Sequence, residues 1–193
     1  HYTKERIKMI EYPTILIVDT PQARTASAAH MEASAVRAMY LRHNFQCYSV
    51  SFVDDLNNHP YDMVCFVGGE DVSPFIYDQP RHPKTQCNPA RDYKEMEFYR
   101  HIPLIIPKVG ICRGGQFLNV MNGGSMIQHI ENHRNTIHSI YTKNTQEYIC
   151  EVNSDHHQEM IENNNKEIIG AETHDYTTEV LYYPDTKSLC FQP

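Results

Sequence analysis

The segment at residues 110–116 (GICRGGQ) constrains the fold of this chain more than any other part of its sequence. It follows an apolar stretch at residues 103–110, which predicts a strand, and precedes residues 113–122, which predict a helix closed by Gly123-Gly124. The form G-x-C-x-G between a strand and a helix is typical of a nucleophile elbow, because glycines beside the nucleophile let strand and helix approach closely. The segment therefore predicts an α/β sheet with Cys112 exposed at the carboxyl end of a strand.

Short apolar runs alternate with helical patterns along the rest of the chain. Residues 14–18 (TILIV) form a continuous apolar run, which predicts a strand buried on both faces. Residues 27–43 carry apolar positions at helical spacing, with Ser27 as a candidate N-cap and Asn44 as a candidate end. We expect a helix at residues 91–101, a loop at 77–90, and further strands at 46–53, 62–67, 147–152, 167–171, 179–183 and 188–192.

This order of elements predicts an α/β fold, a flavodoxin-like three-layer sandwich with a mostly parallel central sheet and helices on both faces. No repeat or linker divides the sequence, so residues 1–193 are expected to form a single domain. A nucleotide-binding flavodoxin-like protein is disfavoured, because no G-x-G-x-x-G motif follows the first strand.

Charge and cysteine usage narrow the class of protein. The chain has 17 Lys and Arg against 24 Asp and Glu, a formal net charge of −7, so we expect no nucleic-acid partner. No apolar run approaches the roughly 18 residues of a membrane span, so no membrane association is expected. The six cysteines stand singly, which favours a cytoplasmic protein without disulfides. Four of them fall in apolar runs and are expected to be buried: Cys47, Cys65, Cys150 and Cys190.

Four segments, in order, resemble the class I glutamine amidotransferases. One is the elbow segment extended to residue 128 (GICRGGQFLNVMNGGSMIQ). The other three are similar to the γ-glutamyl hydrolase (peptidase C26-like) branch of that family. Residues 68–77 (GGEDVSPFIY) are similar to GGxDVxPxxY, and residues 152–158 (VNSDHHQ) to NSxHHQ. Residues 91–97 (RDYKEME) are similar to RDxxE, with Glu95 or Glu97 as the acidic residue. The resemblance implies Cys-dependent hydrolysis of a γ-glutamyl amide bond through a thioester, on a small-molecule γ-glutamyl substrate such as γ-glutamyl-GABA and without a cofactor.

The resemblance also implies roles for individual residues. Cys112 matches the nucleophile, and its place at a helix N-terminus favours the thiolate. The backbone N–H groups of Arg113 and of Gly69, or a neighbour of Gly69, match the oxyanion hole that stabilises the tetrahedral intermediate. The expected substrate-binding residues are Gln116, His156, His157 and Gln158. The alternative for Cys112 is a buried cysteine in a glycine-rich turn.

Other polar residues have simpler interpretations. Asp71 and Arg91-Asp92 are expected to hold loops through local hydrogen bonds. The adjacent His156 and His157 suggest a metal, but no carboxylate completes an evident ligand set, so we expect no metal site. His129 and His133 are expected to be surface or loop residues.

A thiol nucleophile needs a general base and a general acid. In the family this partner is a His oriented by a Glu within a C-terminal pattern similar to FQWHPE. Here Phe191-Gln192-Pro193 matches the start of that pattern, and we expect the catalytic His and Glu just after Pro193, in a longer protein. The start at His1, without a methionine, favours a shortened chain. A less favoured substitute base is His174, with Glu172 or Asp175 beside it.

Three functions remain open, and the first two are forms of the same Cys-dependent hydrolysis of a γ-glutamyl amide bond. The first is a free-standing γ-glutamyl hydrolase, which the GGxDVxPxxY and NSxHHQ resemblances favour. The second is a glutaminase component that delivers ammonia to a separate synthetase partner. The third is a catalytically silent relative that binds a ligand or a protein. The sequence favours the first.

Overall fold

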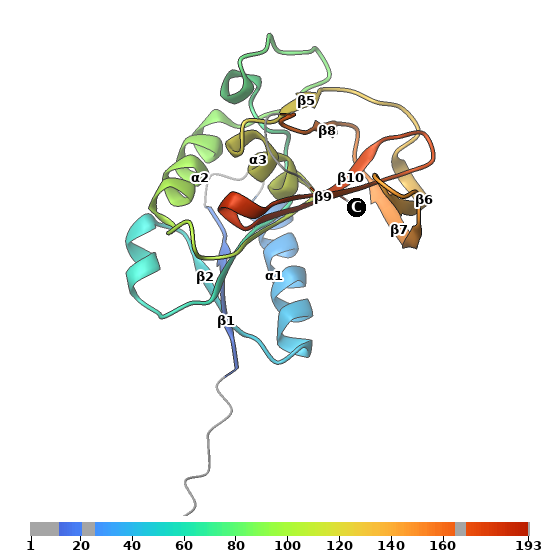
Figure 1. Ribbon diagram of the computed structural model, residues 1–193. Helices are drawn as coiled ribbons and strands as arrows, with labels where there is room; N and C mark the ends of the chain where they lie inside the picture. The colour runs from blue at the N-terminus through green and yellow to red at the C-terminus, as the bar shows by residue number, and fades with distance from the viewer. Residues whose placement is uncertain (1–11, 21–25, 165–168, 193) are drawn as a thin grey trace, which may run out of the picture.

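The structure is a computed structural model that describes residues 12–20, 26–164 and 169–192 (Figure 1). Within this part of the chain, nine strands form a sheet in the order β2-β1-β3-β4-β11-β10-β9-β6-β7. The first five strands are parallel, and the remaining four continue the sheet in antiparallel pairs. The strands are β1 (Thr14–Val18), β2 (Gln46–Val50), β3 (Met63–Phe66), β4 (Lys108–Ile111), β6 (Arg134–Thr142), β7 (Tyr148–Asp155), β9 (Ile169–Glu172), β10 (Thr178–Tyr183) and β11 (Ser188–Phe191).

Helices and a small second sheet complete the fold. The α-helices are α1 (Ala26–Arg42), α2 (Pro89–His101) and α3 (Arg113–Met121), and short 3-10 turns include η1 (Val53–Asn57), η2 (Pro74–Tyr77) and η3 (Pro184–Thr186). Strands β5 (Ser125–Ile127) and β8 (Glu159–Ile161) pair with each other in antiparallel orientation. Helix α2 begins where Asn88, its N-cap, accepts a hydrogen bond from the backbone N–H of Arg91, with Pro89 in the first turn.

The alternation of side chains along β1 builds two apolar cores. Ile15 and Ile17 point to one face of the sheet, where they pack in one cluster with Val36 and Tyr40 of α1. Leu16 and Val18 point to the other face, into a cluster that contains Phe98 of α2 together with Phe117 and Leu118 of α3. Helices thus cover both faces of the parallel strands. The predicted three-layer α/β fold is confirmed.

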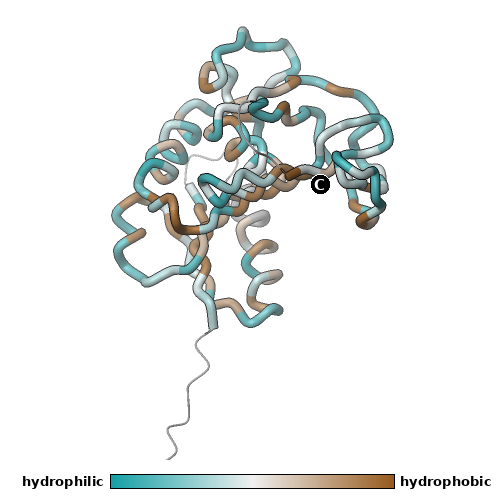
Figure 2. Tube along the Cα trace, viewed as in Figure 1, coloured by the Kyte–Doolittle hydropathy of each residue, from teal (hydrophilic) through white to brown (hydrophobic). Residues whose placement is uncertain are grey.

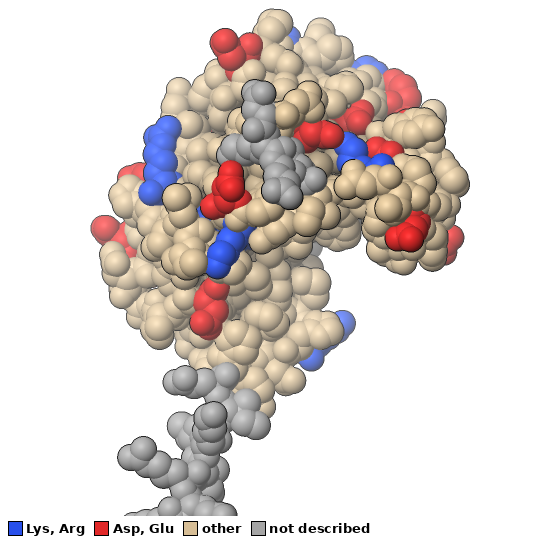
Figure 3. All heavy atoms as spheres, viewed as in Figure 1, with Lys and Arg blue, Asp and Glu red and all other residues tan. Residues whose placement is uncertain are grey.

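The hydropathy of the residues follows this layering. Figure 2 shows hydrophobic residues along the central strands and mostly hydrophilic residues along the loop above them. Acidic and basic side chains are interspersed on the face shown in Figure 3. Among the described residues, no helix combines the length and the apolar character needed to cross a membrane.

The element boundaries follow the sequence-based expectations with definite exceptions. Strand β1 has the expected bounds, but Ser27 lies inside α1, and the strand expected at 46–53 ends at Val50. The first two residues of the strand expected at 167–171 lie outside the described residues. Strands β5, β6 and β8 were not expected, because short or polar strands lack an apolar run.

One of the four cysteine expectations is wrong. Cys47, Cys65 and Cys190 are buried, whereas Cys150 is exposed. Cys150 lies on β7, the last strand of the sheet, and most of that strand is exposed. The pattern of an apolar strand alone does not reveal whether a layer covers it.

Candidate active site

The turn between β4 and α3 has the conformation of a nucleophile elbow. Cys112 adopts φ 53° and ψ −118° at the N-cap of α3. Positive φ is rare for a residue with a side chain, and such backbone strain gathers at functional sites. The backbone N–H of Cys112 donates to the carbonyl oxygen of Phe191 at 2.7 Å, which joins the turn to the end of β11. Cys112 is half-buried at the carboxyl end of the parallel strands.

The glycines around Cys112 are required by close backbone contacts. A Cβ atom on Gly110 would lie 2.2 Å from the carbonyl oxygen of Gly114, and one on Gly114 would lie 2.1 Å from that of Phe66. A Cβ atom on Gly115 would lie 2.8 Å from the backbone of Phe191. Helix α3 therefore approaches β3, β4 and β11 more closely than any side chain would allow.

A second turn, at Gly68-Gly69, lies near the elbow and is connected to it by buried charged side chains. Arg91 donates to the carbonyl oxygens of Val67 (3.1 Å) and Gly68 (2.8 Å). In a trans peptide the N–H points opposite to the C=O, so the N–H of Gly69 points away from Arg91. Gly69 has φ +136°, and a Cβ atom there would lie 2.1 Å from Nη1 of Arg91. Only glycine fits this position.

Five buried charged side chains connect the two turns. Arg91 pairs with Glu70 (2.8 Å) and Glu95 (2.7 Å), and Arg113 pairs with Asp92 and Glu95. Burial raises the pKa of Asp92, although Arg113 acts in the opposite direction. Burial likewise acts to raise the pKa of Glu70, but a backbone hydrogen bond and Arg91 outweigh it and lower that pKa. The RDxxE segment therefore has a positioning role, with Glu95 and not the exposed Glu97 as its last member.

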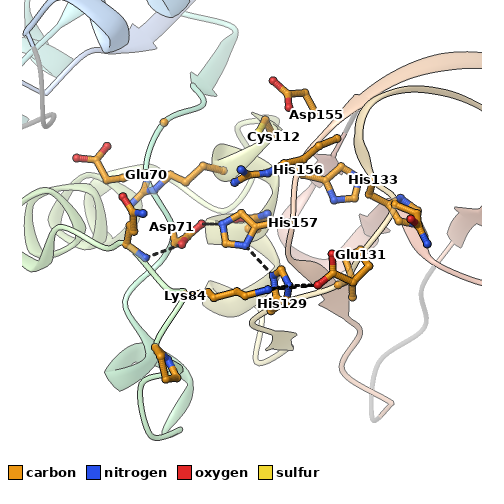
Figure 4. A pocket seen from close by; sticks show the side chains of 18 residues that line it. Glu70, Asp71, Lys84, Cys112, His129, Glu131, His133, Asp155, His156 and His157 are labelled. Carbon is orange, nitrogen blue, oxygen red and sulfur yellow. Dashed lines mark hydrogen bonds and ion pairs between the residues drawn. The ribbon is translucent and has the colours of Figure 1, made fainter.

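A cavity of about 870 Å³ opens beside the elbow. Its walls include Cys112 and the two turns, the loop after η2, the segment that leads into β6 and the segment that follows β7 (Figure 4). Of the predicted site residues, the cavity brings together Gly69, Cys112, Arg113, Gln116, His156 and His157. Further lining residues that the sequence did not single out for the site include Lys84, Glu131, Arg134 and Asp155.

A chain of polar contacts crosses the floor of this cavity (Figure 4). Asp71 accepts a hydrogen bond from the backbone N–H of Gln86 (2.7 Å) and pairs with Nε2 of His157 (3.1 Å). Nδ1 of His157 lies 3.4 Å from His129, which in turn contacts Glu131 (2.7 Å). Burial raises the pKa of Asp71 and lowers that of His157, while their mutual attraction opposes both shifts. Asp71 thus holds a loop, as expected, and also orients His157.

His156 lines the cavity, but its ring nitrogens are already occupied. Nδ1 lies 2.9 Å from the carbonyl oxygen of Gln158 and 2.8 Å from the side-chain amide of Gln192, and Nε2 lies 3.2 Å from Glu179. Gln158 does not line the cavity. Its fully buried side chain donates to the carbonyl oxygen of Gln128 (3.2 Å), beneath the wall that His156 and His157 form.

His133 and His174 do not lie where the sequence suggested a surface residue and a substitute base. His133 is 2% exposed and not a surface residue, because the loop before β6 folds it against Glu179 (3.7 Å) and Asp175 (3.0 Å). His174, the substitute base that the sequence left open, contacts Tyr141 (2.9 Å) and does not line the cavity. No pattern in the sequence pairs His133 with Glu179, because the two residues are 46 positions apart, with strands β6, β7, β8 and β9 between them.

An elbow cysteine at the end of a parallel strand, facing a glycine turn on the neighbouring strand, defines a domain of the class I glutamine amidotransferase type. Solved structures share this fold. A glutamine amidotransferase from Thermotoga maritima matches with a TM-score of 0.64 and 15% identity, over 94% of this chain and 75% of that one. A protein titled "putative gmp synthase subunit a" from Thermoplasma acidophilum matches with a TM-score of 0.62 and 15% identity, over 94% of this chain and 83% of that one.

A family model matches most of the chain. Residues 58–192 match the Peptidase C26 family model, and the chain belongs to the Peptidase C26 family. A relative from Mycobacterium tuberculosis named "Putative glutamine amidotransferase Rv2859c" is 43% identical over 65 residues. That match covers 33% of this chain and 21% of the relative, so the chain spans only about a fifth of the relative's length in this match.

Proposed function

We propose that this protein hydrolyses a γ-glutamyl amide bond, with Cys112 as the nucleophile. The observation that carries the proposal is the strained backbone of Cys112 at the N-terminus of α3, in a cavity that Gly69 also lines. The thiolate attacks the γ-carbonyl carbon, the C–N bond breaks as the amine leaves with a proton, and a thioester remains. Water then hydrolyses the thioester, which releases the γ-carboxylate and restores the thiol.

The oxyanion of each tetrahedral intermediate needs donors that are in place beforehand. The backbone N–H groups of Arg113 and Gly69 are our candidates. Arg113 is the first residue of α3, and N–H groups in a first helical turn have no partner within the helix. The N–H of Gly69 points away from Arg91, which binds the carbonyl of the same peptide. Gln116, one turn along α3 and also in the cavity wall, is the candidate contact for the glutamyl group.

The proton transfers need a base. Of the histidines in the cavity wall, His156 has partners on both ring nitrogens, and those of His157 contact Asp71 and His129. We therefore keep the expectation of a His oriented by a Glu after Pro193. The bond between the backbone of Cys112 and Phe191 supports it, because the end of β11 lies beside the nucleophile.

The rim of the cavity suits a zwitterionic glutamyl group. Arg134 and Asp155 face each other as register partners on β6 and β7, both are exposed, and both line the cavity. A guanidinium binds a carboxylate in a bidentate manner, and a carboxylate accepts from an ammonium. We assign Arg134 to the α-carboxylate and Asp155 to the α-ammonium of the substrate.

A glutaminase that passes ammonia to a synthetase is the second candidate. It is supported by the fold shared with the Thermoplasma acidophilum protein, whose title describes a subunit of a GMP synthase. Assays of the purified full-length protein with glutamine and with γ-glutamyl-GABA separate the two. Turnover of the conjugate without any partner supports the free-standing hydrolase. Glutamine hydrolysis that requires an added synthetase would overturn it. Either activity uses a reduced thiol, which suits the cytoplasm.

A further inference from the structure

Three buried side chains converge behind the wall of the cavity. His133 precedes β6, His156 follows β7 and Glu179 lies on β10, and their nearest ligand atoms all lie within 4.8 Å of one another. Oε1 of Glu179 is 3.2 Å from Nε2 of His156 and 3.7 Å from Nδ1 of His133. The three side chains are 2% exposed or less. In Figure 4, His133 and His156 lie side by side on the same wall.

The hydrogen bonds around this cluster leave electron pairs facing its centre. Nε2 of His133 lies 3.0 Å from the carboxylate of Asp175, so this nitrogen carries its proton outward. Nδ1 of His156 lies 2.9 Å from the carbonyl oxygen of Gln158 and 2.8 Å from the side-chain amide of Gln192, and that amide also donates to the same carbonyl oxygen at 2.6 Å. A metal ion on Nε2 of His156 would place the proton of this ring on Nδ1, toward the carbonyl oxygen. With these tautomers the inward nitrogens of His133 and His156 both face the carboxylate of Glu179. A cation bound between the three side chains would then satisfy all three acceptors in this buried site.

Two atoms of the cluster have no hydrogen bond within the described structure. They are Nδ1 of His133 and Oε2 of Glu179, both buried. The 3.7 Å from His133 to Glu179 is too long for a hydrogen bond. It fits a bridging metal, because two ligands about 2.0–2.1 Å from a tetrahedral zinc ion lie roughly 3.4 Å apart.

We propose that His133, His156 and Glu179 bind a divalent transition metal, with Zn²⁺ as the favoured ion. Two imidazoles and one carboxylate suit Zn²⁺, and Oε2 of Glu179 or a water molecule can complete four ligands. Zinc-bound histidines are commonly oriented by a carboxylate or a backbone carbonyl on the other ring nitrogen, and Asp175 and the carbonyl oxygen of Gln158 hold these places here. Glu179 and Asp175 together balance the charge of the ion. From the sequence we expected no metal, because no carboxylate accompanied His156 there. The fold supplies Glu179 as that carboxylate.

The bound ion has a structural role. It would join the loop before β6, the loop after β7 and strand β10, and so fix the wall of the cavity that carries His156 and His157. The inference does not depend on the identity of the substrate or on hydrolysis.

The test is metal binding by the full-length protein after treatment with a chelator. Titration with Zn²⁺ should give one equivalent per chain, and Co²⁺ should give the visible absorption of a tetrahedral site. At Zn²⁺ of about 100 times Kd, Tm should rise by about 5–10 °C. Asp175→Asn should weaken binding by about 10- to 100-fold, and His133→Asn and Glu179→Gln should abolish the stoichiometric site. His129→Gln, in the same cavity but outside the set, should bind as the wild type does.

Three results would overturn the proposal. The first is no stoichiometric binding by the wild-type protein, in which case the cluster holds protons and not a metal. The second is binding that His133→Asn and Glu179→Gln retain. The third is binding that His129→Gln alone abolishes, which would assign the ion to the floor of the cavity. Because the Co²⁺ spectrum of the wild type reports the ligand set directly, a variant that fails to fold does not prevent the test.

Discussion

Nε of Arg91 donates a hydrogen bond to Glu95 at 2.7 Å, one turn along α2, and both side chains are buried. Through this pair the two turns of the site share one support. Arg91 also binds the carbonyl oxygens of the turn that contains Gly69, and Glu95 also binds Arg113 of the elbow helix. The separation between the proposed nucleophile and the proposed oxyanion donors therefore depends on residues outside the cavity-lining set that we assign to the substrate.

Glu95→Gln tests this support. It removes one negative charge between two buried guanidinium groups, and breaking such a pair costs about 3–5 kcal/mol. We expect a loss of this size in the free energy of unfolding, measured with urea. Glu97→Gln, on the exposed face of the same helix, should change it by about 0.5 kcal/mol or less. Equal effects of the two variants would contradict the positioning role of Glu95.

Gly114→Ala tests the geometry of the elbow. Its Cβ atom would lie 2.1 Å from the carbonyl oxygen of Phe66, so α3 has to move away from β3. We expect a destabilisation of at least about 1–3 kcal/mol and loss of the reaction of Cys112 with a glutamine analogue. In Gly170→Ala the shortest contact, 2.7 Å, is to the flexible side chain of Lys143, so this variant should keep the reaction. A fully reactive Gly114→Ala protein would rule out the close approach.

Arg134→Gln tests recognition of the substrate. Loss of the guanidinium should raise KM for a γ-glutamyl substrate by about 10-fold or more, the equivalent of about 1.5–3 kcal/mol for a charged hydrogen bond, with little change in kcat. Steady-state kinetics measure both constants. Arg81→Gln, whose guanidinium binds the carbonyl oxygen of Thr85, is the matched control and should leave KM unchanged. An unchanged KM in Arg134→Gln would remove Arg134 from the glutamyl site.

Glu70 predicts a pH dependence of stability. Its hydrogen bonds and Arg91 lower its pKa below the ordinary 4.5 in the folded chain, in spite of burial. A carboxyl group of this kind stabilises the folded state above its unfolded pKa, and the contribution is lost as pH falls through the folded pKa. Glu70→Gln should therefore be less stable than the wild type at pH 7, and the difference should shrink below about pH 4.5. A difference that stays constant in acid would contradict the shift.

The sequence predicted the parts of the molecule in which local pattern and tertiary structure agree. The buried run at residues 14–18 and the glycines around Cys112 admit few conformations, so the parallel sheet and the elbow followed from them. The expectation that Cys150 is buried was wrong, because burial depends on which layer covers a strand, and β7 is an edge strand. His133 lies in a loop, one of its two expected places, but its burial and its contact with Glu179 were missed, because the contact forms only when β6, β9 and β10 pair.

The central claim is that Cys112 attacks a γ-glutamyl carbonyl, and covalent labelling tests it most directly. The full-length protein is treated with a diazoketone analogue of glutamine, and the labelled peptide is identified by mass spectrometry. We predict one label per chain, on Cys112, that excess glutamine prevents and that Cys112→Ala abolishes, while Cys87→Ala, another half-buried cysteine, is labelled as the wild type is. An unlabelled Cys112 in a folded, full-length protein, or labelling that Cys112→Ala leaves unchanged, would contradict the account.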